Sequence, residues 1–110
     1  MTIHAGMASG RWLTLTLAEQ LANAGADVGR AIRSAQDGDR GRFDAALDRA
    51  LELLDLTLAD PRWQGPRMRE IARTREVVCD FLVGDNVYGS TAELVEGYFL
   101  AFATAARRDR

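Results

Sequence analysis

The stretch Arg42–Ala59, which reads RFDAALDRALELLDLTLA, decides the fold class of this chain. Its apolar residues recur every three or four positions and form one wide face of a helix. The acidic residues fall on the opposite side: Asp44, Asp48, Glu52 and Asp55. The helix is expected to end at Asp60-Pro61, because the residue before a proline is pushed out of the α region. The pattern is that of a surface helix with one buried face.

Three further segments show the same helical periodicity: residues 12–36, residues 66–83 and a segment that starts after the loop at 84–89. Pro66 suits the first turn of its helix. Ser90 or Thr91 is expected to cap the last helix. No alternating pattern of a strand competes with these assignments.

The connections between these segments are short, so consecutive helices should be antiparallel neighbours. We therefore predict an all-α fold, an up-down-up-down antiparallel four-helix bundle. The prediction places a single domain at residues 11–108 after a flexible N-terminal tail at residues 1–10.

The size and composition bound the class of protein. The 110 residues leave room for one core, and 47% hydrophobic with 27% charged residues argues against disorder. No apolar run approaches the about 18 residues that a membrane span needs. The N-terminal residues lack the basic and then apolar pattern of a signal peptide. We therefore expect a cytoplasmic prokaryotic protein with no membrane contact.

Few residues are suited to catalysis. His4 is the only histidine and Cys79 the only cysteine. A Ser/His/Asp site, a Cys–His nucleophile and a di-iron Glu-x-x-His pattern each need a histidine inside the domain. We therefore expect a non-enzymatic protein with no catalytic residues, no metal site and no cofactor.

Arg75 falls in the middle of the apolar stripe of the 66–83 helix. A core-facing arginine should be paired, and the candidate partners are Gln20 and Asp27 on the first helix and Tyr98 on the last. This predicted buried polar network has two interpretations. It fixes the register of the helices, or Arg75 binds an anion in a cavity of the bundle.

All fourteen basic residues are arginines, and eight of them are expected at one end of the predicted bundle. We predict that seven residues there contact a partner: Arg62, Trp63, Arg67, Arg69, Arg73, Arg107 and Arg108. Arg67 and Arg69 oppose the helix dipole in the first turn of their helix, so local stability does not explain them. Trp63 could stack on a base or cap the core. The alternative is a solvated or self-associating end.

Several apolar residues project away from the main stripes, among them Leu15, Leu56 and Leu100. A bundle of this size with such residues on its surface often self-associates. A homo-oligomer is therefore expected.

Three groups of residues carry a resemblance to known proteins: Leu15–Asn23 (LTLAEQLAN); Ala50–Thr57 (ALELLDLT) with Asp60–Arg62; and Arg75–Val78 (REVV) followed by Gly84–Asn86. Together they resemble an uncharacterised family of short prokaryotic helical proteins over about residues 12–108. The architecture is also similar to HEPN domains and to the Avd-like four-helix bundles. HEPN ribonucleases use an arginine followed by a nearby histidine, and no histidine follows any arginine here. Avd-like proteins are typically basic and pentameric, whereas this chain has a net charge of -2.

These observations favour a helical interaction protein whose arginine-rich end contacts an acidic protein or a nucleic acid such as RNA. The alternative is an RNA-processing or toxin–antitoxin component of the HEPN type.

Overall fold

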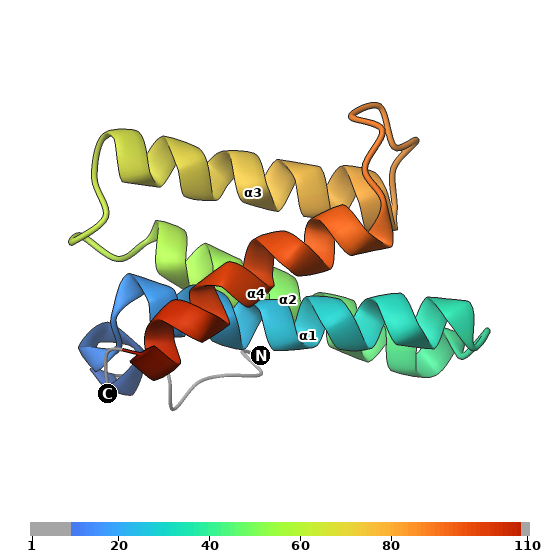
Figure 1. Ribbon diagram of the computed structural model, residues 1–110, viewed down its shortest axis with the longest axis horizontal. Helices are drawn as coiled ribbons and strands as arrows, with labels where there is room; N and C mark the ends of the chain where they lie inside the picture. Colours follow the sequence, from blue (N-terminus) through green and yellow to red (C-terminus); the bar gives the residue numbers. More distant parts are fainter. Residues whose placement is uncertain (1–9, 109–110) are drawn as a thin grey trace.

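The computed structural model describes residues 10–108 of the chain. A short 3-10 helix, η2 (Trp12–Thr14), precedes four α-helices: α1 (Leu17–Gln36), α2 (Arg40–Leu58), α3 (Pro66–Leu82) and α4 (Ala92–Arg108). The helices run up-down-up-down (Figure 1), and the described residues contain no strand. The predicted all-α four-helix fold is confirmed. The predicted flexible tail lies, except for Gly10, outside the described residues.

The start of α1 differs from the prediction. The Thr16 hydroxyl accepts a hydrogen bond from the Glu19 amide at 3.1 Å, and the Glu19 carboxylate accepts one from the Thr16 amide at 2.9 Å. This reciprocal capping box satisfies two amides that the helix leaves open. Leu15 is extended, with φ -78° and ψ 149°. The α-helix therefore begins at Leu17 and not at Trp12.

The other helices also begin at side-chain or backbone caps. The Asp39 carboxylate accepts from the Arg42 amide at 3.0 Å, so α2 begins slightly before the predicted position. The Thr91 hydroxyl accepts from the Leu94 amide at 3.1 Å, which makes Thr91 and not Ser90 the cap of α4. Pro66 occupies the first turn of α3, as predicted.

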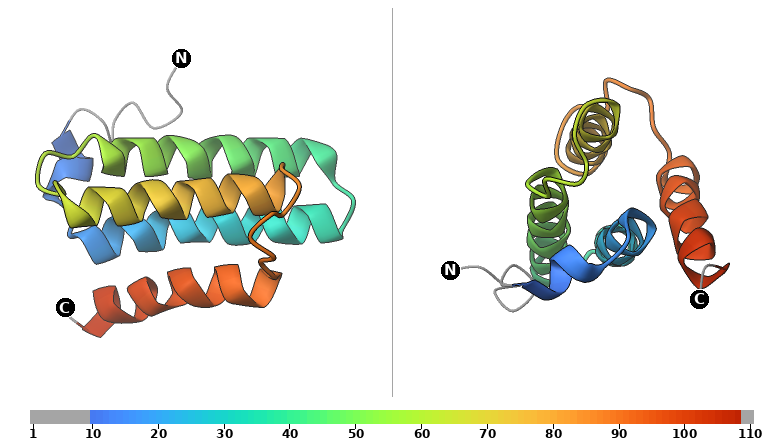
Figure 2. Two further views of the ribbon diagram at one scale, coloured as in Figure 1. Left: turned by 90° about the horizontal axis from the view of Figure 1, so that it is seen from above. Right: turned by 90° about the vertical axis from the view of Figure 1, so that its left-hand side faces the viewer.

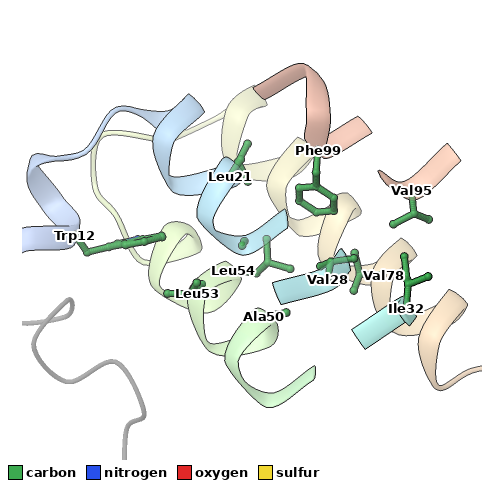
Figure 3. Close-up of a cluster of buried hydrophobic side chains, with 11 residues drawn as sticks. Trp12, Leu21, Val28, Ile32, Ala50, Leu53, Leu54, Val78, Val95 and Phe99 are labelled. Carbon is green, nitrogen blue, oxygen red and sulfur yellow. The ribbon is translucent and has the colours of Figure 1, made fainter. Parts of the chain in front are cut away.

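Helix α1 is the central helix, because it packs against both α2 and α4. Its contact with α4 depends on Gly25. A Cβ atom at that position would lie 2.5 Å from Phe99 Cβ, so only glycine admits the Phe99 ring at this depth. Figure 3 shows Phe99 and Val95 of α4 in the same buried cluster as Val28 of α1.

Helix α3 packs mainly against α2, and its backbone barely approaches that of α4. Seen end-on, the helices form an arc in the order α3, α2, α1, α4 (Figure 2, right). We had expected α3 and α4 to be direct neighbours. The loop between them is held by Asp80, whose carboxylate accepts from the amides of Val87 and Tyr88, and its length lets α4 return to α1.

No helix in the described part of the chain is long and apolar enough to cross a membrane.

Candidate functional site

A buried polar cluster closes the end of the molecule where α1 begins. Asp60 has no solvent exposure. Its carboxylate accepts from Gln20 Nε2 at 2.9 Å and from Arg62 Nη2 at 2.7 Å. The hydrogen bond from Arg62, with a smaller contribution from Gln20, lowers the pKa of Asp60 to about 2, although burial acts in the opposite direction. Arg62 also donates to the Leu15 carbonyl at 2.7 Å. The Arg62 side chain therefore holds this end together.

Trp63 belongs to the same cluster. Its side chain is buried, and its indole N–H donates to Gln20 Oε1 at 2.8 Å. The Arg62 guanidinium lies 4.5 Å from the centre of its ring. Little of the Trp63 ring remains available for a base, so the structure places it as a cap on the core. The backbone carbonyl of Trp12, the other tryptophan, accepts a hydrogen bond from Gln20 Nε2 at 2.9 Å.

The structure does not join Arg75 to the partners predicted from the sequence. Arg75 Nε instead donates to Asp55 Oδ1 at 2.7 Å, and 34% of the Arg75 side chain is exposed. The reason is a rotation of α3, whose buried residues are Ile71, Thr74 and Val78. Because this face of α3 is buried, Arg75 lies on the flank of the helix that faces α2.

The other members of the predicted network lie in separate places. Gln20 belongs to the Asp60 cluster. Asp27 is buried on α1, where Arg30 and Arg49 donate to its Oδ1 atom at 2.8 and 3.3 Å. Tyr98 belongs to α4, and its hydroxyl contacts Thr74 of α3. The four residues therefore do not form one network. Gln20, Asp27 and Tyr98 belong to three separate clusters, and Arg75 pairs with Asp55 on the flank of α3.

A groove separates α3 from α4, and we call it the α3/α4 groove. It consists of two compartments. The first has a volume of about 240 Å³, and its apolar lining residues are Val77, Val78, Leu94, Val95 and Phe99. The second has a volume of about 460 Å³ and opens at the basic end; its lining includes Leu17, Leu21, Trp63, Ile71, Phe102 and Ala105. Both are lined by α3 on one side and α4 on the other, and the start of α1 also lines the second compartment.

A polar bridge stands between the two compartments. The Tyr98 hydroxyl lies 2.9 Å from Thr74 Oγ1 and donates to the Glu70 carboxylate at 3.5 Å. Burial raises the pKa of Tyr98, so its hydroxyl stays protonated at neutral pH. Tyr98 and Glu70 line both compartments. The bridge therefore divides the two adjacent compartments of the groove from each other, and we call it the divider.

Two arginines of α3 line the groove, one in each compartment. Arg67 lines the compartment at the basic end, and its guanidinium lies 5.9 Å from the Trp63 ring centre. Arg73 lines the other compartment, 4.8 Å from the Tyr88 ring centre. Neither arginine forms an ion pair with a described residue. Glu70 lies between them on α3 and lines both compartments, so the α3 side of the groove carries two arginines and one carboxylate, a net positive charge.

The remaining predicted contact residues lie elsewhere. Arg69 is exposed beside Leu58 on the side of α3 that faces α2. Arg107 and Arg108 are exposed in the last turn of α4, where they complement the helix dipole. The basic end therefore exists, but only Arg67 and Arg73 of the predicted residues combine positive charge with an apolar groove.

The described residues contain no group of three or more His, Cys, Asp or Glu side chains that could hold a metal ion. Comparisons of the chain with protein-family models, with curated proteins and with solved structures found no match. The resemblances drawn from the sequence therefore stay predictions.

Sequence reasoning missed the groove because it assigned its residues to separate features. The predictions placed Arg67 and Arg73 at the basic end and Tyr98 beside Arg75, whereas in the structure Arg67, Arg73 and Tyr98 line the groove. Apolar residues on the facing flanks of two consecutive helices were the available signal.

Proposed function

We propose that this chain is a non-enzymatic protein-binding module, and that its α3/α4 groove holds an amphipathic helix of an acidic partner protein. The observation that carries the proposal is an apolar groove along two helices with Arg67 and Arg73 on one side. An amphipathic helix places its apolar face in such a groove and its charged residues along the rim.

Burial of apolar surface supplies the affinity. A large apolar side chain that becomes fully buried contributes about 1.5–3 kcal/mol before the costs of association are subtracted. The floor of the groove already contains Val78, Val95 and Phe99, which are buried, so a ligand helix would add its side chains to the existing core. Carboxylates facing Arg67 and Arg73 would speed association and exclude basic competitors.

The same geometry favours a protein over RNA as the partner. Binding of single-stranded nucleic acid combines a row of cations with exposed aromatic faces. Here the Trp63 ring is buried at 8% exposure. Apart from Arg67, Arg73 and a few hydroxyl groups, the lining of the groove is mainly aliphatic and aromatic, and such side chains offer a phosphate backbone no further donors. An acidic helix satisfies both the apolar lining and the arginines.

The alternative HEPN-type function needs a histidine near an arginine, and residues 10–108 contain no histidine. A homo-oligomer also stays a prediction. Exposed large apolar residues, such as Val87 at 82% and Leu100 at 59%, lie on different elements outside the groove. Light scattering on the purified protein measures the oligomeric state directly.

Capture from a lysate of the source cells tests the proposed function. The bait proteins are wild type, Arg67→Glu/Arg73→Glu and the control Arg40→Glu/Arg42→Glu. The control reverses the same number of charges at two exposed arginines of α2. We expect wild type and control to retain a protein that the groove variant loses, before and after ribonuclease treatment.

Identity of the captured protein decides the outcome. The proposal requires that an acidic helical segment of that protein, made as a peptide, binds wild type and loses affinity for Arg67→Glu/Arg73→Glu. Recovery of RNA that depends on both arginines would overturn the protein-binding assignment. Equal recovery by all three baits would overturn the assignment of the groove.

A further inference from the structure

We infer that the groove selects a helix by spacing: it takes a ligand helix with large apolar side chains at positions i and i+7 and small residues between them. The inference rests on the proposed function and specifies the partner that the groove fits. It follows from the positions of the two compartments, the divider and the arginines.

The two walls repeat with the same period. On α3, Ile71 lines the compartment at the basic end and Val78 lines the other, seven residues later. On α4, Val95 and Phe102 line the two compartments in the same way, also seven residues apart. At 1.5 Å per residue, seven residues correspond to about 10.5 Å. Both walls therefore place the compartments one heptad apart.

The divider lies at the middle of this repeat on both walls. Thr74 is three residues after Ile71 and four before Val78, and Tyr98 is three residues after Val95 and four before Phe102. Their hydroxyl groups meet at 2.9 Å. A helix lying in the groove passes over this contact with its residues i+3 and i+4. Side chains larger than alanine there would collide with the Tyr98 ring.

The charges define the flank of the ligand helix that carries its acidic residues. Arg67 and Arg73 both belong to α3, and Glu70, which lines both compartments, lies between them, so a carboxylate of the ligand is favoured beside each arginine and not opposite Glu70. On the α4 side, the groove is lined by Leu94 in one compartment and Ala105 in the other. The carboxylates of the ligand therefore lie on the flank toward α3, beside each anchor, while the opposite flank is apolar or small.

Designed peptides test the spacing. The parent is a fluorescein-labelled helix with Leu at i and i+7, Ala at i+3 and i+4 and Glu on one flank. A second peptide of the same composition carries Leu at i and i+11, which lies on the same face of the helix but about 16.5 Å along the axis. A third carries Phe at i+4. Anisotropy gives the affinities, and methyl NMR of Ile71 and Val78 shows whether the groove is occupied.

We expect the parent to bind about ten-fold more tightly than either other peptide, the effect of one large apolar side chain outside its compartment. The i+11 spacing misplaces one Leu directly, and Phe at i+4 does so by holding the helix away from the divider. Tyr98→Ala removes the divider, so the affinity of the Phe peptide for this variant should come within about three-fold of the affinity of the parent peptide. Tyr98→Phe keeps the ring and removes only the hydroxyl contact, so it should retain the discrimination. Circular dichroism checks that both variants fold.

The outcomes separate this inference from the proposed function. Equal affinities with shifts of the Ile71 and Val78 methyl signals would overturn the spacing and leave the groove as a helix-binding site. Retained discrimination against the Phe peptide in folded Tyr98→Ala would overturn the role of the divider. If the parent fails to bind, or binds without shifting these signals, both the spacing and the proposed function are wrong.

Discussion

Asp60 carries a full negative charge in a position without solvent exposure. Arg62 and Gln20 supply the hydrogen bonds that make this possible. Through Gln20, the carboxylate is connected to α1, and through Arg62 it is connected to the Leu15 carbonyl. Asp60 therefore fixes the α2–α3 connection to the start of α1.

We predict that Asp60→Ala lowers the free energy of unfolding by about 3–5 kcal/mol, because it leaves Arg62 and Gln20 without their common acceptor. Asp44→Ala is the control. Asp44 pairs with Arg40 on the surface of α2, so its loss should cost about 0.5 kcal/mol or less. Urea unfolding measures both values, and similar losses in the two variants would contradict the importance of the buried acceptor.

The same carboxylate predicts a loss of stability in acid. The pKa of Asp60 is about 2 in the folded chain and about 3.9 when unfolded. Because the folded pKa is lower, its contribution is complete above about pH 4 and is lost as the pH falls toward 2. The stability difference between wild type and Asp60→Asn should therefore shrink by about 2 kcal/mol between these pH values. A constant difference in urea unfolding would show that Asp60 is not charged in the fold.

The sequence revealed the residues of this cluster but not their roles. Asp60-Pro61 correctly predicted the end of a helix, and Trp63 as a cap on the core was one of two interpretations. Gln20 was assigned to Arg75, because periodicity reports the angle of a residue around its own helix and not which neighbour it meets. The prediction that Arg75 faces the core was wrong for a related reason. Arg75 is one helical turn from both Ile71 and Val78, so periodicity puts it in the stripe, but the buried face also includes Thr74 and is centred away from Arg75.

At the scale of the helix, two glycines in helix interiors have opposite surroundings. Gly25 on α1 has Phe99 Cβ 2.5 Å from the position of a Cβ atom, whereas nothing lies within 4 Å of that position at Gly97 on α4. The first glycine is required by the α1–α4 contact. The second glycine lowers helix stability, and no contact with the described residues requires it.

The same substitution should therefore act in opposite directions at the two sites. Gly25→Ala should destabilise by about 1–3 kcal/mol through overpacking against Phe99. Gly97→Ala should stabilise by about 0.5–1 kcal/mol, because alanine is the better helix former. Thermal unfolding of the two variants and of wild type shows whether each substitution lowers or raises stability. A destabilising Gly97→Ala would show that a contact outside this chain occupies that surface.

Helix ends were predictable where a capping side chain carried the signal. Thr16 and Glu19 form a Thr-x-x-Glu pattern that is visible in the sequence, and it would have placed the start of α1 correctly. The periodicity before it was misleading because Trp12 is buried, at 1% exposure, but belongs to the separate helix η2. An apolar residue can thus extend a stripe without extending the helix.

For the whole molecule, the arc of helices predicts uneven protection. Helix α1 is covered by α2 and α4, whereas α3 packs mainly against α2 and borders the groove. Segments with fewer packed neighbours open at lower free energy. We therefore expect lower amide protection factors in α3 than in α1 by hydrogen exchange. Equal protection would indicate that α3 opens only when the whole chain unfolds.

Fold class, helix order and direction followed from periodicity and short connections. The open side between α3 and α4 did not, because a connection limits the distance between two helix ends but not the angle at which the second helix leaves. Phe99 and Gly25 determine that angle by drawing α4 onto α1. The groove depends on this pairing of distant residues, which no local pattern encodes.

The packing of α4 on α1 also constrains the order of folding. The α1–α2 hairpin joins residues close in sequence and can form early, but Phe99 meets Gly25 only after a loop of more than seventy residues has closed. During synthesis, the surface of α1 around Gly25 lacks its α4 contact until α4 has left the ribosome, because α4 follows α1 by more than fifty residues. The nascent chain therefore exposes the apolar α1 surface that α4 later covers, and that interval is one in which it is prone to aggregate.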